Sequence, residues 1–183
     1  MTFSTSPGVL IAVPQLHDQN FVRSVVLMVE HTKDGAVGLV LNHVLDHTCA
    51  AVTEELDIEW SGAAQTTLSR GGPVEPQSLW IVHHDGWSFA ETRRVSEGLS
   101  VSRSREALTR MCACREPRLL LIVGYAGWGP GQLEREILQG SWLTSSVHPE
   151  LVFDWPRGEV WHRALLAMGV DPAHLVEGAS EIQ

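Results

Sequence analysis

Short apolar runs recur along the chain, and each has the length of a β-strand. Three of them cover residues 8–14, 78–84 and 118–125. Two more, residues 24–31 and 36–42, are almost continuously apolar. Runs of this kind, bounded by turn residues, are typical of strands that are buried on both faces. We therefore expect a sheet whose central strands lie inside the molecule.

The two almost continuous runs are separated by a turn that contains Asp34-Gly35. This dipeptide supplies the positive φ angles of a two-residue hairpin turn. With Asp34-Gly35 as the loop, the two strands pair antiparallel and His31 faces Gly38, whose missing side chain leaves room for the imidazole. The sequence thus predicts a specific register as well as a hairpin.

Helical periodicity is found in four segments, residues 48–57, 104–116, 130–140 and 156–169. Thr48 and Ser104 stand where an N-cap residue is expected. The apolar stripes predicted to face the core are Ala51, Val52 and Leu56 in the first helix, and Ala107, Leu108, Met111 and Cys112 in the second.

The combination of these elements predicts the fold class. A tight hairpin is antiparallel, whereas strands joined through helices can be parallel. The expected fold is therefore α+β, with a mixed sheet surrounded by helices. Shorter strands are expected at 93–96 and 99–102. Because the chain has 183 residues and no Gly-, Ser- or Pro-rich linker, residues 1–183 are expected to form one domain.

The charge balance is acidic, with 13 basic and 22 acidic residues and a formal net charge of −9. This argues against a protein that wraps nucleic acid, because such binding depends on clustered Lys and Arg. Residues 93–118 are a local exception, with seven Arg and three Glu. We expect these arginines to pair with carboxylates on a solvated face. The alternative is a surface for an anion or a partner.

Cysteine usage and hydropathy indicate a cytoplasmic protein. The three cysteines, Cys49, Cys112 and Cys114, have no paired spacing, which fits a reducing compartment and inert, buried thiols. The apolar stretch near the start is not preceded by Lys or Arg, unlike a secretory signal. No apolar run approaches the roughly 18–20 residues of a membrane helix, so no membrane association is expected.

The most distinctive stretch is GYAGWGPGQLE, from Gly124 to Glu134, which leads from a predicted buried strand into a helix. Its glycines permit sharp turns, and the helix start offers free N–H groups. The spacing matches neither a Walker loop nor a dinucleotide fingerprint. Two interpretations stay open: a tight strand-to-helix corner with Trp128 packed over the core, or a ligand cleft. Arg70–Val74 (RGGPV) similarly predicts a bend where another backbone approaches.

Together these stretches resemble the AlgH/YqgE family of bacterial proteins. The matching strings, in chain order, are LIAVPQL, FVRSVVLMVEH, GAVGLVLN, RGGPV, LWIVHH and GYAGWGPGQLEREI. The resemblance implies a bifurcated mixed sheet, part of it barrel-like, surrounded by helices. Members of this family are often labelled transcriptional regulators and carry no established catalytic residues. The resemblance therefore implies a regulatory role without naming a reaction.

Polar residues stand at the ends of three predicted strands. We expect the glycine-rich corner after Tyr125 to meet these strand ends and to form one concave site for a small ligand or a protein partner. The residues of this candidate ligand cleft are Glu30, His31, Asn42, His84, Gly127, Trp128 and Gly129. The preferred hypothesis is a non-enzymatic binding module with a regulatory role.

An enzyme, for example a hydrolase, is the first alternative. In it, His84 acts as the base, Glu30 or Asp85 orients that base, and the Gly127–Gly131 turn stabilises an oxyanion. The weakness of this hypothesis is the nucleophile, because no Ser or Cys stands in a nucleophile elbow.

A DNA-binding regulator is the second alternative, based on the family label and the Arg-rich segment. Direct nucleic-acid binding is not favoured, because the sequence has no helix-turn-helix, zinc-finger or RNA-binding signature. His43, Asp46 and His47 are weak candidates for a metal site, because structural zinc needs four ligands and no further strong ligand lies nearby. We expect neither a metal nor a cofactor.

Overall fold

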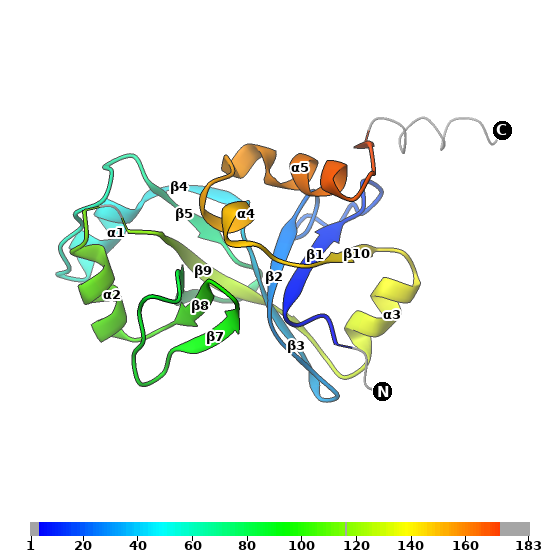
Figure 1. Ribbon diagram of the computed structural model, residues 1–183, viewed down its shortest axis with the longest axis horizontal. Helices are drawn as coiled ribbons and strands as arrows, with labels where there is room; N and C mark the ends of the chain where they lie inside the picture. The colour runs from blue at the N-terminus through cyan, green and yellow to red at the C-terminus, as the bar shows by residue number, and fades with distance from the viewer. Residues whose placement is uncertain (1–3, 116, 173–183) are drawn as a thin grey trace.

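The computed structural model describes residues 4–115 and 117–172 (Figure 1). Its sheet has the strand order β10-β1-β2-β3-β9-β6-β8-β7, with a β4–β5 ribbon attached through β5. The strands are β1 (Gly8–Ala12), β2 (Val25–Thr32), β3 (Gly35–Val40), β4 (Val44–Thr48), β5 (Thr67–Arg70), β6 (Val74–His83), β7 (Arg93–Ser96), β8 (Leu99–Ser102), β9 (Leu119–Trp128) and β10 (Trp142–Ser145). The helices are α1 (Cys49–Glu55), α2 (Arg105–Cys112), α3 (Gln132–Leu138), α4 (Pro149–Phe153) and α5 (Val160–Ala167), with a 3-10 turn, η1 (Arg157–Glu159), before α5.

Strand β9 divides the sheet into two parts. Its second half pairs with β3 and continues into the first half-sheet, which consists of β10, β1, β2 and β3. Its first half pairs with β6 and continues into the second half-sheet, which consists of β6, β8 and β7. The described pairs are antiparallel except β5 with β9. The α+β class and the mixed, bifurcated sheet are confirmed, whereas the described strands do not close into the expected barrel-like region.

Successive side chains of the central strands point to opposite faces of the sheet, and both faces are buried. On β1, Val9 and Ile11 pack in one core cluster with Leu165 of α5, whereas Leu10 packs in another with Leu133 of α3. This is the two-residue period of a strand that is covered by helices on both sides. A third cluster lies under α1 and α2 against β6 and β9. Helices therefore cover both half-sheets, as Figure 1 shows.

The predicted hairpin forms, but its turn lies one residue earlier than predicted, which moves the partner of His31 by two residues, from Gly38 to Ala36. Thr32 pairs with Gly35 and His31 with Ala36, and the pairing shifts again between Met28 and Glu30. The loop is therefore Lys33-Asp34. Gly35 has a φ of +137°, and a Cβ there would lie 2.4 Å from the carbonyl oxygen of Trp128. The position of the turn is set by the close approach of β9, a tertiary contact that local turn preferences cannot predict.

The helix predictions were confirmed in part. In α2, the Ser104 side chain accepts a hydrogen bond from the Ala107 amide at 3.1 Å, and the predicted stripe is buried. In α1, the predicted Thr48 cap is present and Val52 of the expected stripe packs against the core, but the fully buried residues are Cys49 and Thr53. The pattern of apolar residues predicts no strand directly before Thr48, yet Val44–Thr48 form strand β4. Among the described residues, no helix combines the length and apolar character needed to cross a bilayer.

The bend predicted at RGGPV is confirmed. A Cβ on Gly71 would lie 2.3 Å from the Gly124 carbonyl oxygen, and one on Gly72 would lie 2.3 Å from Tyr125. Only glycine permits such an approach of two backbones. The two glycine-rich motifs of the sequence therefore meet each other in the middle of β9.

Candidate functional site

The residues expected to form one cleft are distributed along the full length of β9. Gly127 and Trp128 pair with Val37 and Ala36 at the end of this strand. The His84 amide donates to the Arg118 carbonyl just before the strand begins. Ten residues of extended chain cover roughly 30 Å. His84 and the glycine-rich corner therefore lie at opposite ends of β9 and do not share a hollow.

Asn42 lies at the opposite end of β3 from the corner. Its Oδ1 accepts a hydrogen bond from the Val25 amide at 2.8 Å, and its Nδ2 donates to the Arg23 carbonyl at 2.8 Å. Both ends of the amide are thus used to hold the start of β2 against the end of β3. The observed role of this side chain is to close the hairpin.

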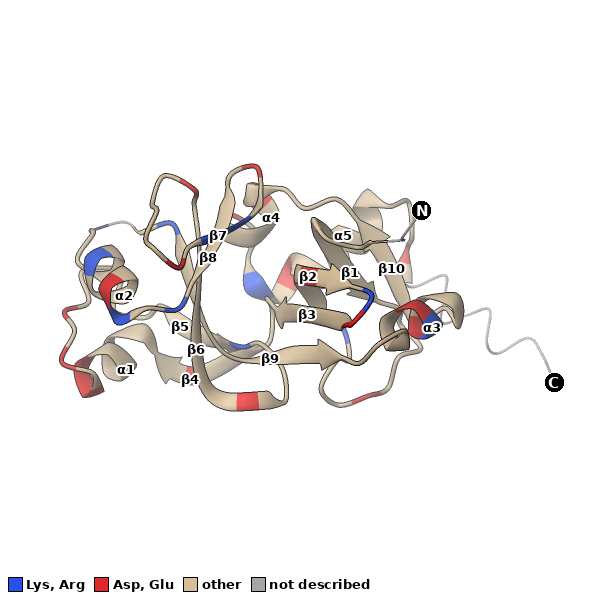
Figure 2. Cartoon of the chain, turned by 90° about the horizontal axis from the view of Figure 1, so that it is seen from below, with Lys and Arg blue, Asp and Glu red and all other residues tan. Residues whose placement is uncertain are grey.

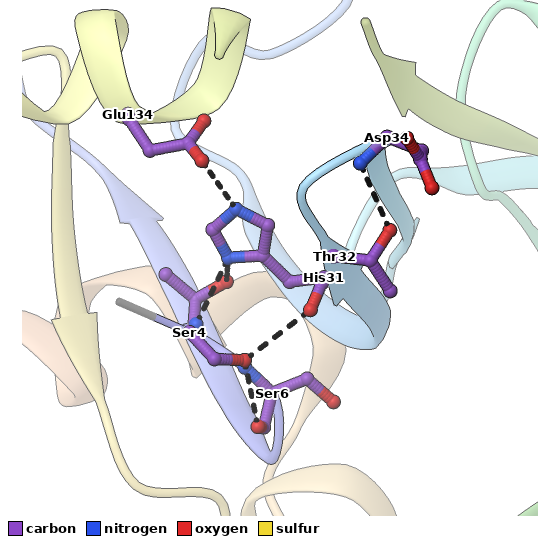
Figure 3. Close-up of polar contacts among 7 residues, drawn as sticks. Ser4, Ser6, His31, Thr32, Asp34 and Glu134 are labelled. Carbon is purple, nitrogen blue, oxygen red and sulfur yellow. Dashed lines mark hydrogen bonds and ion pairs between the residues drawn. The ribbon is translucent and has the colours of Figure 1, made fainter. Parts of the chain in front are cut away.

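His31 and Glu30 point to opposite faces of β2, as neighbouring strand residues do. The buried His31 accepts a hydrogen bond at Nδ1 from the Thr5 amide, so its Nε2 carries the proton and donates to Glu134 at 3.2 Å (Figure 3). Glu30 instead pairs with Arg93 of β7. Only His31 therefore lies beside the start of α3, and Glu30 belongs to a different surface.

The glycine-rich corner is a closed hydrogen-bond network. The indole N–H groups of Trp128 and Trp142 both donate to Glu136 Oε2, at 2.9 and 2.8 Å. Gln132 donates to the other carboxylate oxygen of Glu136 at 2.9 Å and accepts from the Gly129 amide at 3.0 Å. Because each of these polar groups is satisfied within the protein, the geometry matches the interpretation of a tight structural corner.

A different hollow lies between the two half-sheets. Figure 2 shows β2 and β3 on one side and β7 and β8 on the other, with β9 joining them. This inter-sheet cleft has a volume of about 220 Å³. Its lining residues are Val29, Glu30, Val37, Trp80, Glu91, Arg93, Val101 and Arg103. Of the expected site residues, Glu30 alone lines it.

Ion pairs and stacking fix the charged side chains at this cleft. Arg93 Nη1 lies 2.6 Å from Glu30 Oε2 and thereby connects β7 to β2. The Arg103 guanidinium lies 4.3 Å from the centre of the Trp80 ring, a cation–π contact, and donates to Ser78 Oγ at 2.6 Å. Both arginines are therefore held in place at the cleft wall.

Glu91 is the second carboxylate of the cleft. Its Oε1 accepts hydrogen bonds from the backbone amides of Ser104 at 3.0 Å and Arg103 at 3.4 Å. Hydrogen bonding, first from the Ser104 side chain and then from backbone amides, lowers the pKa of Glu91. The group therefore remains an anion at neutral pH.

Trp80, which lines the cleft, carries a buried donor without a partner among the described residues. Its side chain is only 8% exposed, and its indole N–H has no hydrogen-bond partner among the described residues. The indoles of Trp128, Trp142 and Trp161 all have one. An unpaired buried donor costs about 1–3 kcal/mol. Sequence reasoning missed Trp80, because the sequence does not show which tryptophan lacks an acceptor.

A Ser–His pair also escaped sequence reasoning. His83 Nδ1 lies 2.9 Å from the His84 carbonyl oxygen, so this nitrogen carries the proton and Nε2 accepts from Ser102 Oγ at 2.8 Å. That tautomer suits a nucleophile–base pair. Both side chains are fully enclosed, and Ser102 also contacts Thr92 at 2.7 Å. Burial lowers the pKa of His83. The pair therefore closes a buried network instead of facing a substrate.

Most arginines of the segment 93–118 form ion pairs with carboxylates, which balance their positive charge. Arg94 pairs with Asp85 at 3.5 Å, and Arg118 donates both of its contacts to Asp154, at 3.0 and 2.9 Å. These ion pairs match the interpretation of a solvated, paired face. Among the described residues, no three His, Cys, Asp or Glu side chains are grouped to hold a metal ion.

Comparisons with known proteins agree with one another. The family model for AlgH-like proteins, DUF179, matches residues 9–173. A UPF0301 protein of Myxococcus xanthus is 43% identical over 175 residues, 94% of this chain and 96% of the relative. One from Vibrio cholerae is 34% identical over 177 residues, 93% of this chain and 95% of the relative.

Solved structures show the same fold. The solution structure of the AlgH protein from Pseudomonas aeruginosa matches with a TM-score of 0.76 and 33% identity, covering 96% of this chain and 97% of that one. The crystal structure of a Corynebacterium diphtheriae protein matches with a TM-score of 0.73 and 26% identity, covering 91% and 88%.

Proposed function

The chain belongs to the AlgH-like DUF179 family, and we propose that it is a binding module whose ligand site is the inter-sheet cleft. One observation carries this proposal. The buried indole N–H of Trp80 lacks a partner among the described residues, and Trp80 lines the cleft. A ligand with a carbonyl or carboxylate oxygen would supply the missing acceptor and recover the cost of the unpaired donor.

The size of the cleft restricts the ligand. Pockets for drug-sized molecules have volumes of roughly 300–1,000 Å³, whereas this cleft measures about 220 Å³. A small metabolite fits this volume better than a nucleotide. The wall combines three valines and an indole with a few charged groups, which is the usual composition of a small-molecule site.

Binding is favoured over catalysis by the chemistry of the wall. Among the described residues that line the cleft there is no Ser, Cys or His. Glu30 is engaged by Arg93, and Glu91 is held as an anion by its hydrogen bonds. A wall without a free nucleophile or base suits recognition more than proton transfer. The buried Ser102–His83 pair does not line the cleft, which leaves the hydrolase alternative with less support.

A regulatory role would use the position of the cleft. Arg93 and Glu30 connect the two half-sheets across it, so a ligand that binds beside this ion pair would bias how the half-sheets sit against each other. Regulation would then pass through the ligand or a protein partner instead of direct contact with DNA. The cytoplasmic location expected from the sequence fits this role. The thiols are consistent with the inert cysteines expected for that location, because burial raises the pKa of Cys49 to about 12 and that of Cys112 to about 11.

The test observes the Trp80 indole N–H by heteronuclear NMR. The probes are a panel of amino-acid-sized carboxylic acids, amides and amino acids, and Trp80→Phe assigns the signal. We expect at least one class to move this signal saturably while the signals of Trp128 and Trp142 stay in place. Trp60→Phe, which alters a distant indole bonded to Ala63, should retain the response. If no probe moves the Trp80 signal saturably, the cleft is not the ligand site.

A further inference from the structure

The charges that line the inter-sheet cleft are balanced in sign. Arg93 and Arg103 are cationic, and Glu30 and Glu91 are anionic. A ligand with a single negative charge would face two carboxylates, and a ligand with a single positive charge would face two guanidinium groups. A ligand that carries one charge of each sign finds an opposite charge on this wall for both of them. The wall therefore suits a ligand that carries both signs.

We infer that the ligand is a small zwitterion with the chemistry of a free apolar α-amino acid. The inference rests on the proposed function of the cleft and specifies its ligand class. Three groups of the ligand would be recognised by three parts of the wall: the carboxylate, the ammonium and the apolar side chain. An uncharged amide or a peptide interior would use only one of them.

The carboxylate would bind Arg93 and the Trp80 indole. Only Nη1 of Arg93 is engaged by Glu30, and a guanidinium offers five N–H donors in a fork that matches a carboxylate. Arg93 can therefore bind a second carboxylate without losing Glu30. The Trp80 N–H would donate to the same group and gain the acceptor that it lacks.

The ammonium would bind Glu91. Both backbone amides that contact Glu91 reach Oε1, and the Ser104 side chain also hydrogen-bonds this carboxylate. Because Glu91 is exposed and held as an anion, its carboxylate is a fixed acceptor for a charged donor. Glu30 supplies a second negative charge at the cleft wall.

The side chain of the amino acid would pack against Val29, Val37 and Val101. These valines come from β2, β3 and β8, so the apolar wall is shared by both half-sheets. Val29, Val101 and Trp80 are already buried, so an aliphatic group in this space would gain packing contacts with them and cover the partly buried Val37. Leucine, valine and methionine are therefore better matched than acidic or basic amino acids, whose charged side chain would face this apolar wall.

The test compares L-leucine with two analogues, each lacking one charge. Isocaproate lacks the ammonium, and isoamylamine lacks the carboxylate. Binding to the full chain is followed by calorimetry and by the Trp80 indole signal. We expect leucine to bind at least about tenfold more tightly than either analogue, because each lost charged hydrogen bond is worth that factor or more.

Matched variants assign each charge to its side chain. Glu91→Gln keeps an acceptor for the two amides but removes the charge, and we expect it to abolish the preference for leucine over isocaproate. Arg93→Gln should weaken leucine and isocaproate but not isoamylamine. Glu75→Gln is the control, because Glu75 pairs with Arg103 at 3.8 Å but does not line the cleft. Unchanged Trp128 and Trp142 signals verify that each variant is folded.

The outcomes separate the two proposals. If isocaproate binds as well as leucine, or if only amides move the Trp80 signal, the zwitterion inference is overturned and the binding cleft stands. The same holds if leucine binds but Glu91→Gln keeps the full discrimination. If none of the probes in the wider panel binds, the proposed function itself fails.

Discussion

Two tryptophan-containing regions of this protein differ in how their polar groups are satisfied. At the glycine-rich corner, Glu136 accepts the indole N–H groups of both Trp128 and Trp142. At the inter-sheet cleft, the buried Trp80 N–H has no partner among the described residues. The corner has the conspicuous sequence, and the cleft has the unmet hydrogen-bonding need. The distinctive motif of this chain therefore forms a tight structural corner, whereas the cleft that we propose as the ligand site contains a tryptophan with an unpaired donor.

The largest effect on stability is expected for Glu136→Ala, at the glycine-rich corner. The variant leaves two largely buried indole donors without an acceptor, and we expect a loss of roughly 2–5 kcal/mol in the free energy of unfolding, measured by chemical denaturation. Glu159→Ala is the control, because it removes only an exposed pair with Arg163 and should cost within about 0.5 kcal/mol. Equal losses in the two variants would mean that the corner is not a stability element.

The contact between the corner and the hairpin is tested by Gly35→Ala. A Cβ at this position would lie 2.4 Å from the Trp128 carbonyl oxygen, and φ is +137°. We expect a loss of about 1–3 kcal/mol in unfolding free energy. Gly140→Ala adds a Cβ at a φ of +77° with nothing within 4 Å, so its cost should be backbone strain alone, about 1 kcal/mol. The prediction fails if the two variants are equally stable.

A matched pair of tryptophan substitutions compares the two regions directly. Trp142→Phe removes a donor that Glu136 uses, whereas Trp80→Phe removes a donor without a partner. Both changes shrink the ring equally and keep an aromatic ring in place, so the hydrogen bond is the main difference. We expect Trp142→Phe to cost about 1–3 kcal/mol more unfolding free energy than Trp80→Phe. A larger loss for Trp80→Phe would show that its N–H is satisfied in solution.

The smallest expected effect is a pH dependence from His83 in the second half-sheet. Burial lowers the pKa of folded His83 below its ordinary value of 6.5, so the unfolded chain binds the proton first. The stabilisation is complete above pH 6.5 and is lost as the pH falls below it toward the folded pKa. Stability curves for His83→Gln should show a flatter fall in this window. His17→Gln, at an exposed position, should keep the slope of the wild type.

Local patterns predicted the elements best where local physics decides them. The Ser104 cap and the buried stripe of α2 depend on contacts within one helix turn, and both are as expected. The strands around Gly98 also have the expected bounds. By contrast, the ribbon of β4 and β5 is held by pairing between segments about twenty residues apart and with β9. No pattern within either segment reveals such a partner.

The amino-acid sequence alone predicted the α+β class, the buried central strands, the bend at RGGPV and the family resemblance. These features depend on the spacing of apolar residues, on helix caps and on glycine-rich motifs, each of which can be recognised within a few residues. The location of the cleft was decided only by tertiary structure. Trp128 lies at the end of strand β9, whereas His84 hydrogen-bonds to Arg118 just before this strand begins, so the two are far apart. The arrangement of the two half-sheets instead places Glu30 beside Arg93. Whether a buried donor such as the Trp80 indole N–H finds an acceptor depends on every segment that packs around it, and these segments come together only in the folded chain.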